Sequence, residues 1–419
     1  MREELEAVYE SAREWSRAHD YAGHDPFDAL NSRLFRSTPF RRSRLARLAW
    51  TQALKRSPVC LRRLALVPRG RNSKGTALFA LAALSRFRAT READRQREAQ
   101  EHWREARALL GDLLAARVET ESGAAWGYNF DWQGRAFYAP LGTPTLVPTA
   151  FAVRALCEAC AAFDTDARSA AGGADYLAYT EAALAAREFI VRDLNRSDET
   201  EDEVCFSYTP LDRTRVFNAS LLAGEALALV GALASNTASF DLALRSARYV
   251  VRRQRPDGSW GYGADSYQSW ADNFHTAFVL TSLARFLRTA EGSPAARGYT
   301  SADGEEIRRA IRRGYEFWRE RFFLADGWPK YYHRSAHPAD AHSAGAALVA
   351  CAELIDIEPD AIDLARRVAR WSVRELFDRR GFFYYQKRRF HTVRTPFMRW
   401  SQGWMMYGLA RLLEVSGEQ

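Results

Sequence analysis

Two histidines lie at matched positions in the second half of the chain. His275 and His342 each follow an aspartate, Asp272 or Asp340, and each precedes an apolar run rich in small residues. Aspartate at such a place can cap a helix, which puts each histidine in a first helical turn. An imidazole beside a carboxylate can accept or donate a proton near neutral pH. We therefore take His275, His342 and Asp272 as candidate catalytic residues; capping or packing is the alternative role.

Other side chains could support proton transfer. Tyr331 and Tyr384 could act as acids beside a cation, and arginines could hold a carboxylate or phosphate through two parallel hydrogen bonds. The arginine candidates are Arg135, Arg334 and Arg399. Zinc bound by both histidines and an aspartate is an alternative, but no HExxH-like spacing is present. We expect no metal and no other cofactor.

Aromatic and polar residues gather in short segments between apolar runs. Aromatic planes stack on the apolar faces of sugar rings, while Asp, Asn and Arg bond sugar hydroxyls. We expect about half of the tryptophans, Trp260 above all, to pack between structural units instead. The candidate substrate-binding residues are Trp126, Tyr128, Asn129, Asp131, Trp132, Arg135, Asn218, Tyr262, Trp270, Asn273, Lys330, Tyr332, Arg334, Asp340, Arg399 and Gln402.

These segments belong to a repeat. Residues 252–287 read as the end of a helix, a Pro-Asp-Gly turn, an aromatic loop and a second helix. Similar units occur at 123–149, 205–220, 326–343 and 381–402, with a cruder copy at 68–74. Asn218 precedes His275 by 57 residues, and His275 precedes His342 by 67. Each unit is thus long enough for two helices and a loop.

The helices alternate in character. The first of each pair is charged and amphipathic, as at Glu305–Phe322, whereas the second is apolar and suited to burial on all sides. This pattern predicts an all-α (α/α)6 toroid, or barrel, with an extra N-terminal helix and arm. We expect the helix and arm in 1–40, the barrel in 41–419 and the first outer helix at Phe40–Arg56. The loops should converge on one cavity at one end of the ring.

Composition sets further bounds. The 419 residues carry a net charge of +8 and are 47% hydrophobic, which is ordinary for a globular protein. We assign the basic excess to arginines scattered over the outer helices, either as a solvated surface or as an attraction to an anionic substrate or membrane surface. No nucleic-acid recognition motif is present. The Cys157-x-x-Cys160 pair lies in an apolar run, which favours core packing over a redox role.

The chain starts without the apolar region of a signal peptide, and no apolar run reaches transmembrane length. We expect a reduced, cytoplasmic protein with no stable membrane insertion. The oligomeric state stays open.

Four motifs resemble a known group of proteins: Trp126 to Trp132, Asp272 to Thr276, Asp340 to Ser343 and Met398 to Gln402. They resemble six-hairpin carbohydrate-active proteins found with bacterial exopolysaccharide biosynthesis enzymes. The barrel domain of glucuronyl C5-epimerases is similar at the level of fold only. The Pro-Asp-Gly-Ser-Trp-Gly stretch also resembles terpenoid cyclases, but their Asp-x-Asp-Asp motif is missing.

The resemblance implies an enzyme acting on an acidic, uronate-containing poly- or oligosaccharide. We expect C5-epimerisation by proton abstraction, with His275, His342, Tyr331 or Tyr384 moving protons and Arg135 or Arg399 holding the carboxylate. A polysaccharide lyase would use the same groups, whereas a glycoside hydrolase would need two carboxylates such as Asp131 and Asp272. A non-catalytic glycan-binding protein is the alternative from another class. Under each of these hypotheses we expect an acidic glycan as the substrate or ligand and polysaccharide-assembly enzymes as partners.

Overall fold

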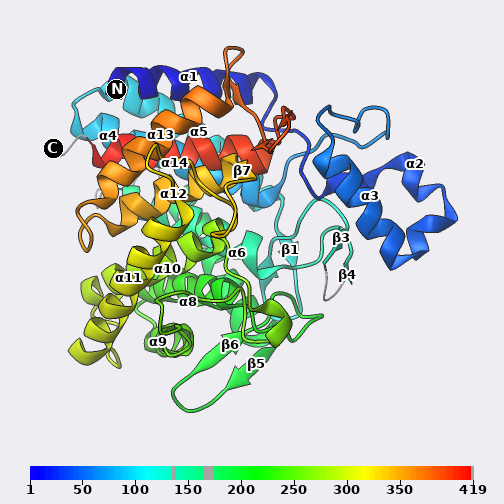
Figure 1. Cartoon of the computed structure of the whole chain (residues 1–419). Coiled ribbons are helices and arrows are strands. Elements are labelled where there is room, and N and C mark those ends of the chain that lie inside the picture. The colour runs from blue at the N-terminus through cyan, green and yellow to red at the C-terminus, as the bar shows by residue number, and fades with distance from the viewer. Residues whose placement is uncertain (135–137, 164–172, 417–419) are drawn as a thin grey trace.

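The computed structural model of the chain describes residues 1–134, 138–163 and 173–416. In this part, six inner helices pack one against the next, and the last contacts the first (Figure 1). They are α4 (Ser73–Glu92), α6 (Leu146–Ala162), α8 (Phe217–Ala234), α10 (Asn273–Gly292), α12 (Ala341–Leu354) and α14 (Trp404–Val415).

Each inner helix has an outer partner. The outer helices α5 (Gln96–Ala115), α7 (Gly173–Glu188), α9 (Thr237–Val251), α11 (Ser301–Phe322) and α13 (Ala361–Leu376) cover the inner helices that precede them, and α1 (Arg2–Ala18) packs on α14. The predicted (α/α)6 toroid is confirmed.

The prediction that Phe40–Arg56 forms the first outer helix is wrong. Three equivalent turn glycines show which helix takes the outer place, because each lies against the backbone of a neighbouring outer helix. A Cβ on Gly258 would meet Arg313 of α11, one on Gly327 would meet Arg367 of α13, and one on Gly381 would meet Ser11 of α1. Helix α1 therefore stands where α11 and α13 stand in their own repeats, and it closes the ring from the N-terminus.

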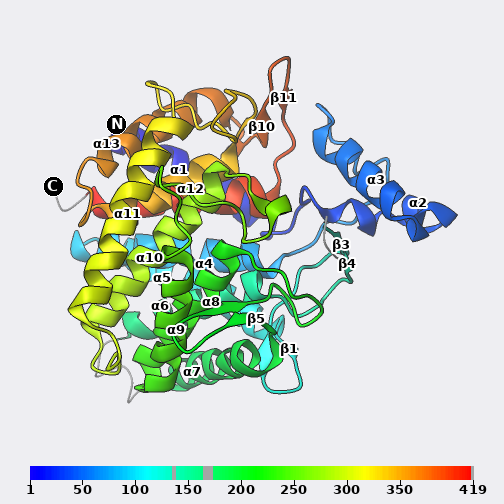
Figure 2. The same cartoon turned by 60° about the horizontal axis from the view of Figure 1, so that its bottom comes forward.

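Residues 28–56 project from the ring as an arm (Figures 1 and 2). The arm holds η1 (Asp28–Asn31), α2 (Arg33–Arg36), η2 (Pro39–Arg42) and α3 (Arg44–Arg56). Its own small core joins Ala29, Leu54, Ala65 and Val67. At its base, buried Arg62 donates to Asp28 at 2.7 Å, which fixes the arm to the segment that follows α3.

The inner helices are apolar because they are covered on nearly every side. Among the described residues, α8 is long and apolar enough to cross a membrane by length and composition alone, but 78% of it is buried inside the ring. The same burial accounts for the cysteine pair, since Cys157 and Cys160 both lie in the core on α6. All five cysteines are free thiols.

The remaining elements are short and lie in the loops. Antiparallel pairs join β1 (Val118–Glu119) to β2 (Ala124–Ala125), β3 (Trp132–Gln133) to β4 (Tyr138–Ala139), β5 (Arg196–Glu199) to β6 (Val204–Phe206) and β8 (Phe377–Asp378) to β9 (Phe382–Phe383). A three-stranded sheet has the order β11 (Thr392–Val393), β10 (Gln386–Lys387), β7 (Ala339–Asp340). The short helical turns are η3 (Phe189–Asp193), η4 (Ser266–Gln268) and η5 (Met398–Gly403).

One backbone contact recurs around the ring and positions the aromatic loops. The first N–H of an inner helix donates to the carbonyl of an aromatic residue in the next repeat. These bonds run from Leu146 to Tyr208, from Phe217 to Tyr262, from Asn273 to Tyr331 and from Ala341 to Tyr385. Because the first N–H groups of a helix have no partner inside the helix, the bonds satisfy them and fix the backbone of each aromatic loop against the start of an inner helix.

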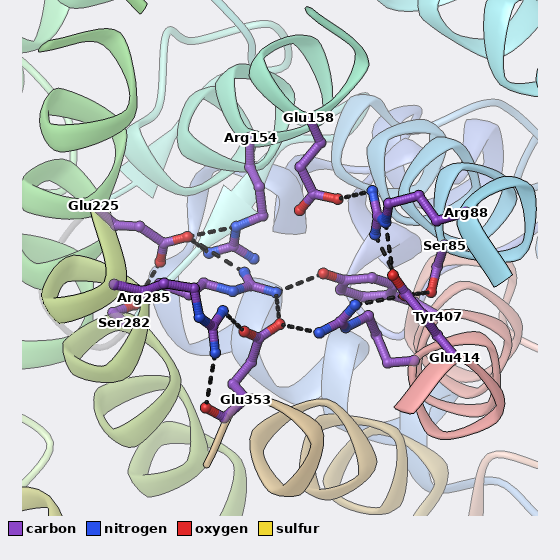
Figure 3. Close-up of polar contacts among 12 residues, drawn as sticks. Ser85, Arg88, Arg154, Glu158, Glu225, Ser282, Arg285, Glu353, Tyr407 and Glu414 are labelled. Atoms are coloured by element: carbon purple, nitrogen blue, oxygen red, sulfur yellow. Dashed lines mark hydrogen bonds and ion pairs between the residues drawn. The ribbon is translucent and has the colours of Figure 1, made fainter. Parts of the chain in front are cut away.

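The far end of the ring is closed by buried ion pairs between the inner helices (Figure 3). Arg285 of α10 donates to Glu353 of α12 at 2.8 Å and to the Tyr407 hydroxyl of α14 at 2.6 Å. Glu225 of α8 accepts from Arg154 of α6 at 2.6 Å. The surrounding guanidiniums overcome the effect of burial and hold the pKa of Glu353 well below its usual range.

Candidate functional site

A cavity of about 480 Å³ opens at the end of the ring where the inner helices begin. Its lining includes residues from the start of each inner helix or from the turn just before it. The positive ends of six helix dipoles therefore point toward this space, which favours a negatively charged occupant. The volume is in the range of small-molecule sites.

Asp272 and His275 form a bonded pair on the cavity wall. One carboxylate oxygen of Asp272 caps α10 by accepting from the His275 backbone N–H at 3.0 Å. The other lies 2.7 Å from the His275 Nδ1. Because a carboxylate only accepts, Nδ1 carries the proton and Nε2 is left as an acceptor. The histidine side chain is 23% exposed, while the aspartate is buried. The pair can thus accept a proton from a bound ligand.

His342 lines the floor of the same cavity but is 1% exposed. Its ring packs against Phe274 and Trp400, with ring centroids 4.3 and 4.1 Å away. Neither ring nitrogen has a hydrogen-bond partner among the described residues. Burial, reinforced by the nearby Lys74 and Arg399, holds the pKa of His342 well below its usual range. The imidazole is therefore neutral.

Tyr331 stands beside the Asp272–His275 pair. Its backbone carbonyl accepts from the first N–H of α10, and its ring contacts Phe274 with centroids 5.6 Å apart. Burial, together with the charges of Asp272 and Asp340, raises the pKa of Tyr331 well above its usual range. The phenol stays protonated and can donate.

Besides the histidines, two basic side chains among the described residues line the cavity, and they differ in their partners. Arg399 donates through Nε and Nη2 to both carboxylate oxygens of Asp25, at 2.7 and 2.8 Å, so its charge is balanced. The Lys74 ammonium lies 4.5 Å from the Phe151 ring centre and 5.1 Å from that of Phe278, with no carboxylate of the described residues bonded to it. Burial holds the pKa of Lys74 well below its usual range.

Aromatic rings form most of the cavity wall. Tyr262 stacks on Trp270 with centroids 4.9 Å apart and meets the His275 ring edge-on at 4.7 Å. On the other side, the Tyr128 and Tyr208 hydroxyls lie 3.4 Å apart. Of the predicted site residues, the cavity brings together Asp272, His275, Tyr331, His342, Tyr128, Trp132, Asn218, Tyr262, Trp270, Tyr332 and Arg399.

Several predicted residues lie in the framework instead. Trp126 is fully buried, and its indole N–H donates to the Leu113 carbonyl at the end of α5. Trp260 makes the equivalent bond to Val250 of α9, as expected for a packing residue. Asn273 accepts from the Trp318 indole at 2.9 Å. The Gln402 side chain accepts from the Phe383 backbone N–H and donates to the Phe383 carbonyl.

Another group lies outside the cavity lining. Asp131 pairs with Arg36 of the arm at 3.0 Å, and Asn129 accepts from Asn72 at 2.8 Å. Tyr384 donates to Asp378 at 2.5 Å. Asp340 caps α12, Lys330 donates to the His333 carbonyl, and Arg334 lines a separate outer groove. Arg135 lies outside the described residues.

The list of candidate site residues omitted part of the lining. Phe27, Tyr208, Phe274, Phe278 and Trp400 face the cavity, and so does Lys74, which the sequence places in a basic cluster with Arg62, Arg63, Arg69 and Arg71 suited to anion contact. A signal for Lys74 is present: the chain has four lysines against 56 arginines, and this one stands at the start of an otherwise apolar helix. Phe274 and Phe278 carry no comparable signal, because a phenylalanine on an inner helix reads as core.

The acidic groups of the cavity are few. Among the described residues that line it, Asp272 is the single carboxylate. Asp131 and Asp272, the two carboxylates that a hydrolase would need, therefore do not face the cavity together. No group of three or more His, Cys, Asp or Glu among the described residues is placed to hold a metal ion.

No protein-family model and no curated protein matches the sequence. Solved structures share the fold. A cellobiose 2-epimerase from Bacillus thermoamylovorans B4167 matches with a TM-score of 0.56 and 11% identity over 83% of this chain and 88% of that one. A glycosyl hydrolase of family 88 from Bacteroides vulgatus matches with a TM-score of 0.56 and 8% identity over 99% of each chain. A polysaccharide lyase matches with a TM-score of 0.58 and 6% identity over 100% of this chain and 99% of that one. At these identities the likeness establishes the fold alone.

Proposed function

We propose that this chain is a carbohydrate-active enzyme that epimerises a uronate-containing saccharide at C5. The observation that carries the proposal is the Asp272–His275 pair facing a cavity walled by aromatic rings, with the protonated Tyr331 phenol beside it. A hydrogen on a carbon next to a carboxyl group is removed most easily by a positioned base whose partner can return a proton. The solved structures with this fold include an epimerase, a hydrolase and a lyase.

In the proposed step, Nε2 of His275 takes the C5 proton, and Asp272 stabilises the imidazolium that forms. Tyr331 donates a proton to the opposite face of the same carbon, which inverts it. The proton balance is restored when the imidazolium passes its proton back through water to the phenolate. His342 is neutral and almost fully covered, so we assign it a positioning role beneath Phe274 rather than direct contact with the substrate.

The uronate part of the proposal rests on Lys74 and on the helix ends. Lys74 is buried with no carboxylate partner among the described residues, so its charged form gains most from a ligand that brings its own negative charge. A substrate carboxylate near Lys74 would be stabilised further as the C5 proton leaves, because charge then spreads onto its oxygens. Arg399 is already paired with Asp25, so we propose that it shapes the cavity and does not clamp the substrate.

The hydrolase alternative finds less support in this cavity, since its second carboxylate is not in place. A lyase remains chemically close, because it starts with the same proton abstraction. We also propose a cytoplasmic location and an association with exopolysaccharide synthesis; the free cysteines support the first, and the four sequence motifs support the second.

The test is NMR of uronate oligosaccharides and of a neutral reducing disaccharide incubated with the protein in deuterated water. Deuterium at C5 of a uronate that disappears in His275→Ala, with exchange still measurable in His342→Gln, is the expected result. Deuterium at C2 of the neutral sugar would point to a sugar 2-epimerase instead, and an unsaturated product that absorbs in the ultraviolet would identify a lyase. Binding without exchange or cleavage would refute proton transfer and favour a glycan-binding protein.

A further inference from the structure

The basic charge of this protein is concentrated in one stretch rather than scattered over the outer helices. Residues 29–71 contain eleven arginines and one lysine but no aspartate or glutamate. This stretch, here called the basic arm, carries +12, whereas the rest of the chain carries −4, giving the total of +8. It includes α2 and α3, which project from the ring (Figures 1 and 2).

Half of these twelve charges are exposed and have no carboxylate partner in the described part of the fold. Arg62 pairs with Asp28, Arg36 with Asp131, and Arg71 with Asp20 and Asp112. A larger group is exposed and bonds no carboxylate of the described residues; it comprises Arg33, Arg41, Arg42, Arg56, Arg63 and Arg69. On the ring, several exposed arginines pair with carboxylates, as in Arg107 with Asp175 and Arg374 with Asp326.

Large apolar side chains are exposed on the same stretch. Their exposed fractions lie between 50 and 77%, and they alternate with the arginines: Leu34, Phe40, Leu45, Val59, Leu64 and Leu66. Nothing in the described part of the chain covers them. A mixture of arginines with Leu and Phe is typical of segments that lie in the headgroup region of a membrane, where the apolar groups enter the acyl boundary and the cations meet anionic lipids.

We propose that the basic arm docks the protein on the surface of an anionic lipid bilayer without spanning it. A second copy of the chain is disfavoured as the occupant, because two surfaces with this charge repel each other. A soluble polyanion would bind the arginines but would gain nothing from six exposed aliphatic and phenyl groups. This inference does not depend on the reaction proposed above.

The arm also adjoins the cavity. The Lys55 ammonium of α3 lies 4.1 Å from the ring centre of Phe27, and Phe27 lines the cavity. Docking through the arm would therefore bring the mouth of the ring near the lipid headgroups, where a saccharide attached to a membrane lipid could reach it.

The experiment is co-sedimentation of the full chain with vesicles of phosphatidylcholine alone or of an equal mixture of phosphatidylcholine and phosphatidylglycerol. We expect binding to the mixed vesicles only. Arg41→Gln with Arg42→Gln should weaken binding about 25-fold, since each arginine contributes about fivefold. Phe40→Ser with Leu45→Ser should weaken the binding that persists at high salt by at least about tenfold for each side chain.

The matched control combines Arg97→Gln with Leu177→Ser, two exposed residues on outer helices of the ring. It should bind like the wild type, and circular dichroism of each variant shows whether the fold is kept. Absence of binding to mixed vesicles, or equal losses in arm and control variants, would overturn the proposal. So would binding to a soluble uronate polymer that exceeds vesicle binding and is unaffected by Phe40→Ser with Leu45→Ser.

Discussion

At the scale of single residues, the site depends on what each charged group is bonded to. Asp272 uses one oxygen for the helix cap and the other for His275, so one residue fixes both the start of α10 and the orientation of the imidazole. The charge of Arg399 is balanced by Asp25, whereas Lys74 has no carboxylate partner among the described residues. Residues of the same charge therefore have different roles in the proposed reaction.

Asp272→Asn should lower the rate of deuterium exchange by about 10²- to 10⁴-fold, the usual range for losing a general base. The asparagine oxygen can still cap the helix, but its amide would donate to Nδ1 and move the imidazole proton to Nε2. Exchange rates at saturating substrate measure the effect. Asp131→Asn is the matched control: its carboxylate faces Arg36 outside the cavity, so its rate should stay near that of the wild type. Equal losses in both variants would show that the loss of exchange is not specific to the Asp272–His275 pair.

Lys74→Met should weaken binding of a uronate oligosaccharide by about 10- to 100-fold, the usual contribution of a hydrogen bond to a charged group. Methionine keeps the contacts with Phe151 and Phe278. Burial lowers the pKa of Lys74 and a bound anion would raise it again, so anion binding is coupled to proton uptake and wild-type affinity should fall as pH rises. Calorimetry measures both effects. Lys330→Met, which loses only a bond to the His333 carbonyl, should bind normally. Unchanged affinity in Lys74→Met would refute the assignment of Lys74.

At the scale of elements, the inner helices α10 and α12 each have two functions along their length. Helix α10 presents Phe274 and His275 to the cavity in its first turn, and Ser282 and Arg285 reach the ion-pair network farther along. Helix α12 does the same with His342 and Glu353. The network therefore fixes the helices whose first turns carry the site.

Glu353→Gln should destabilise the protein by about 3–5 kcal/mol, because Arg285 would lose a buried carboxylate partner. Urea denaturation followed by circular dichroism gives the free energy of unfolding. Arg97→Gln on α5, which removes a surface ion pair with Glu101, should change that free energy little. A stability equal to that of the wild type in Glu353→Gln would show that the network is not needed to hold the ring closed.

At the scale of the whole molecule, the ring is closed by α1, and one contact of this closure involves a histidine. Arg13 of α1 donates to Glu105 of α5 at 2.6 Å, and His102 of α5, which is 2% exposed, meets the Tyr9 ring of α1 edge-on with centroids 6.4 Å apart. Burial, with the charges of Arg13, Arg86 and Arg95, lowers the pKa of His102 to about 3. The closure of the ring should therefore be sensitive to acid.

The sign of this pH dependence follows from the protons bound. Unfolded histidine takes a proton below about pH 6.5, whereas folded His102 and His342 do not, so stability falls as the pH drops below this value. Each histidine contributes about 1.4 kcal/mol per pH unit in that window. Urea midpoints at several pH values should show a shallower acid loss in His102→Gln than in the wild type. An unchanged pH dependence would refute the role of His102.

The sequence by itself determined the ring and many of the residues that face its cavity. Its helical periodicity and its repeated aromatic loops follow from local chemistry, because amphipathic spacing, caps and turns are encoded over a few residues. The helix cap that Asp272 forms three residues before His275 is one of these locally encoded features. So does the packing role of Trp260, since an indole after a turn bonds the end of its own outer helix.

Only the tertiary structure decided which basic side chains face the cavity and which are paired with a carboxylate. Lys74 stands in one basic cluster with Arg69 and Arg71, but of these three only Lys74 lines the cavity. Arg399 and Asp25 are 374 residues apart in the chain, and α1 closes the ring on α14 at the opposite end of the sequence. Such pairings depend on how the ring closes, and no local pattern contains that information.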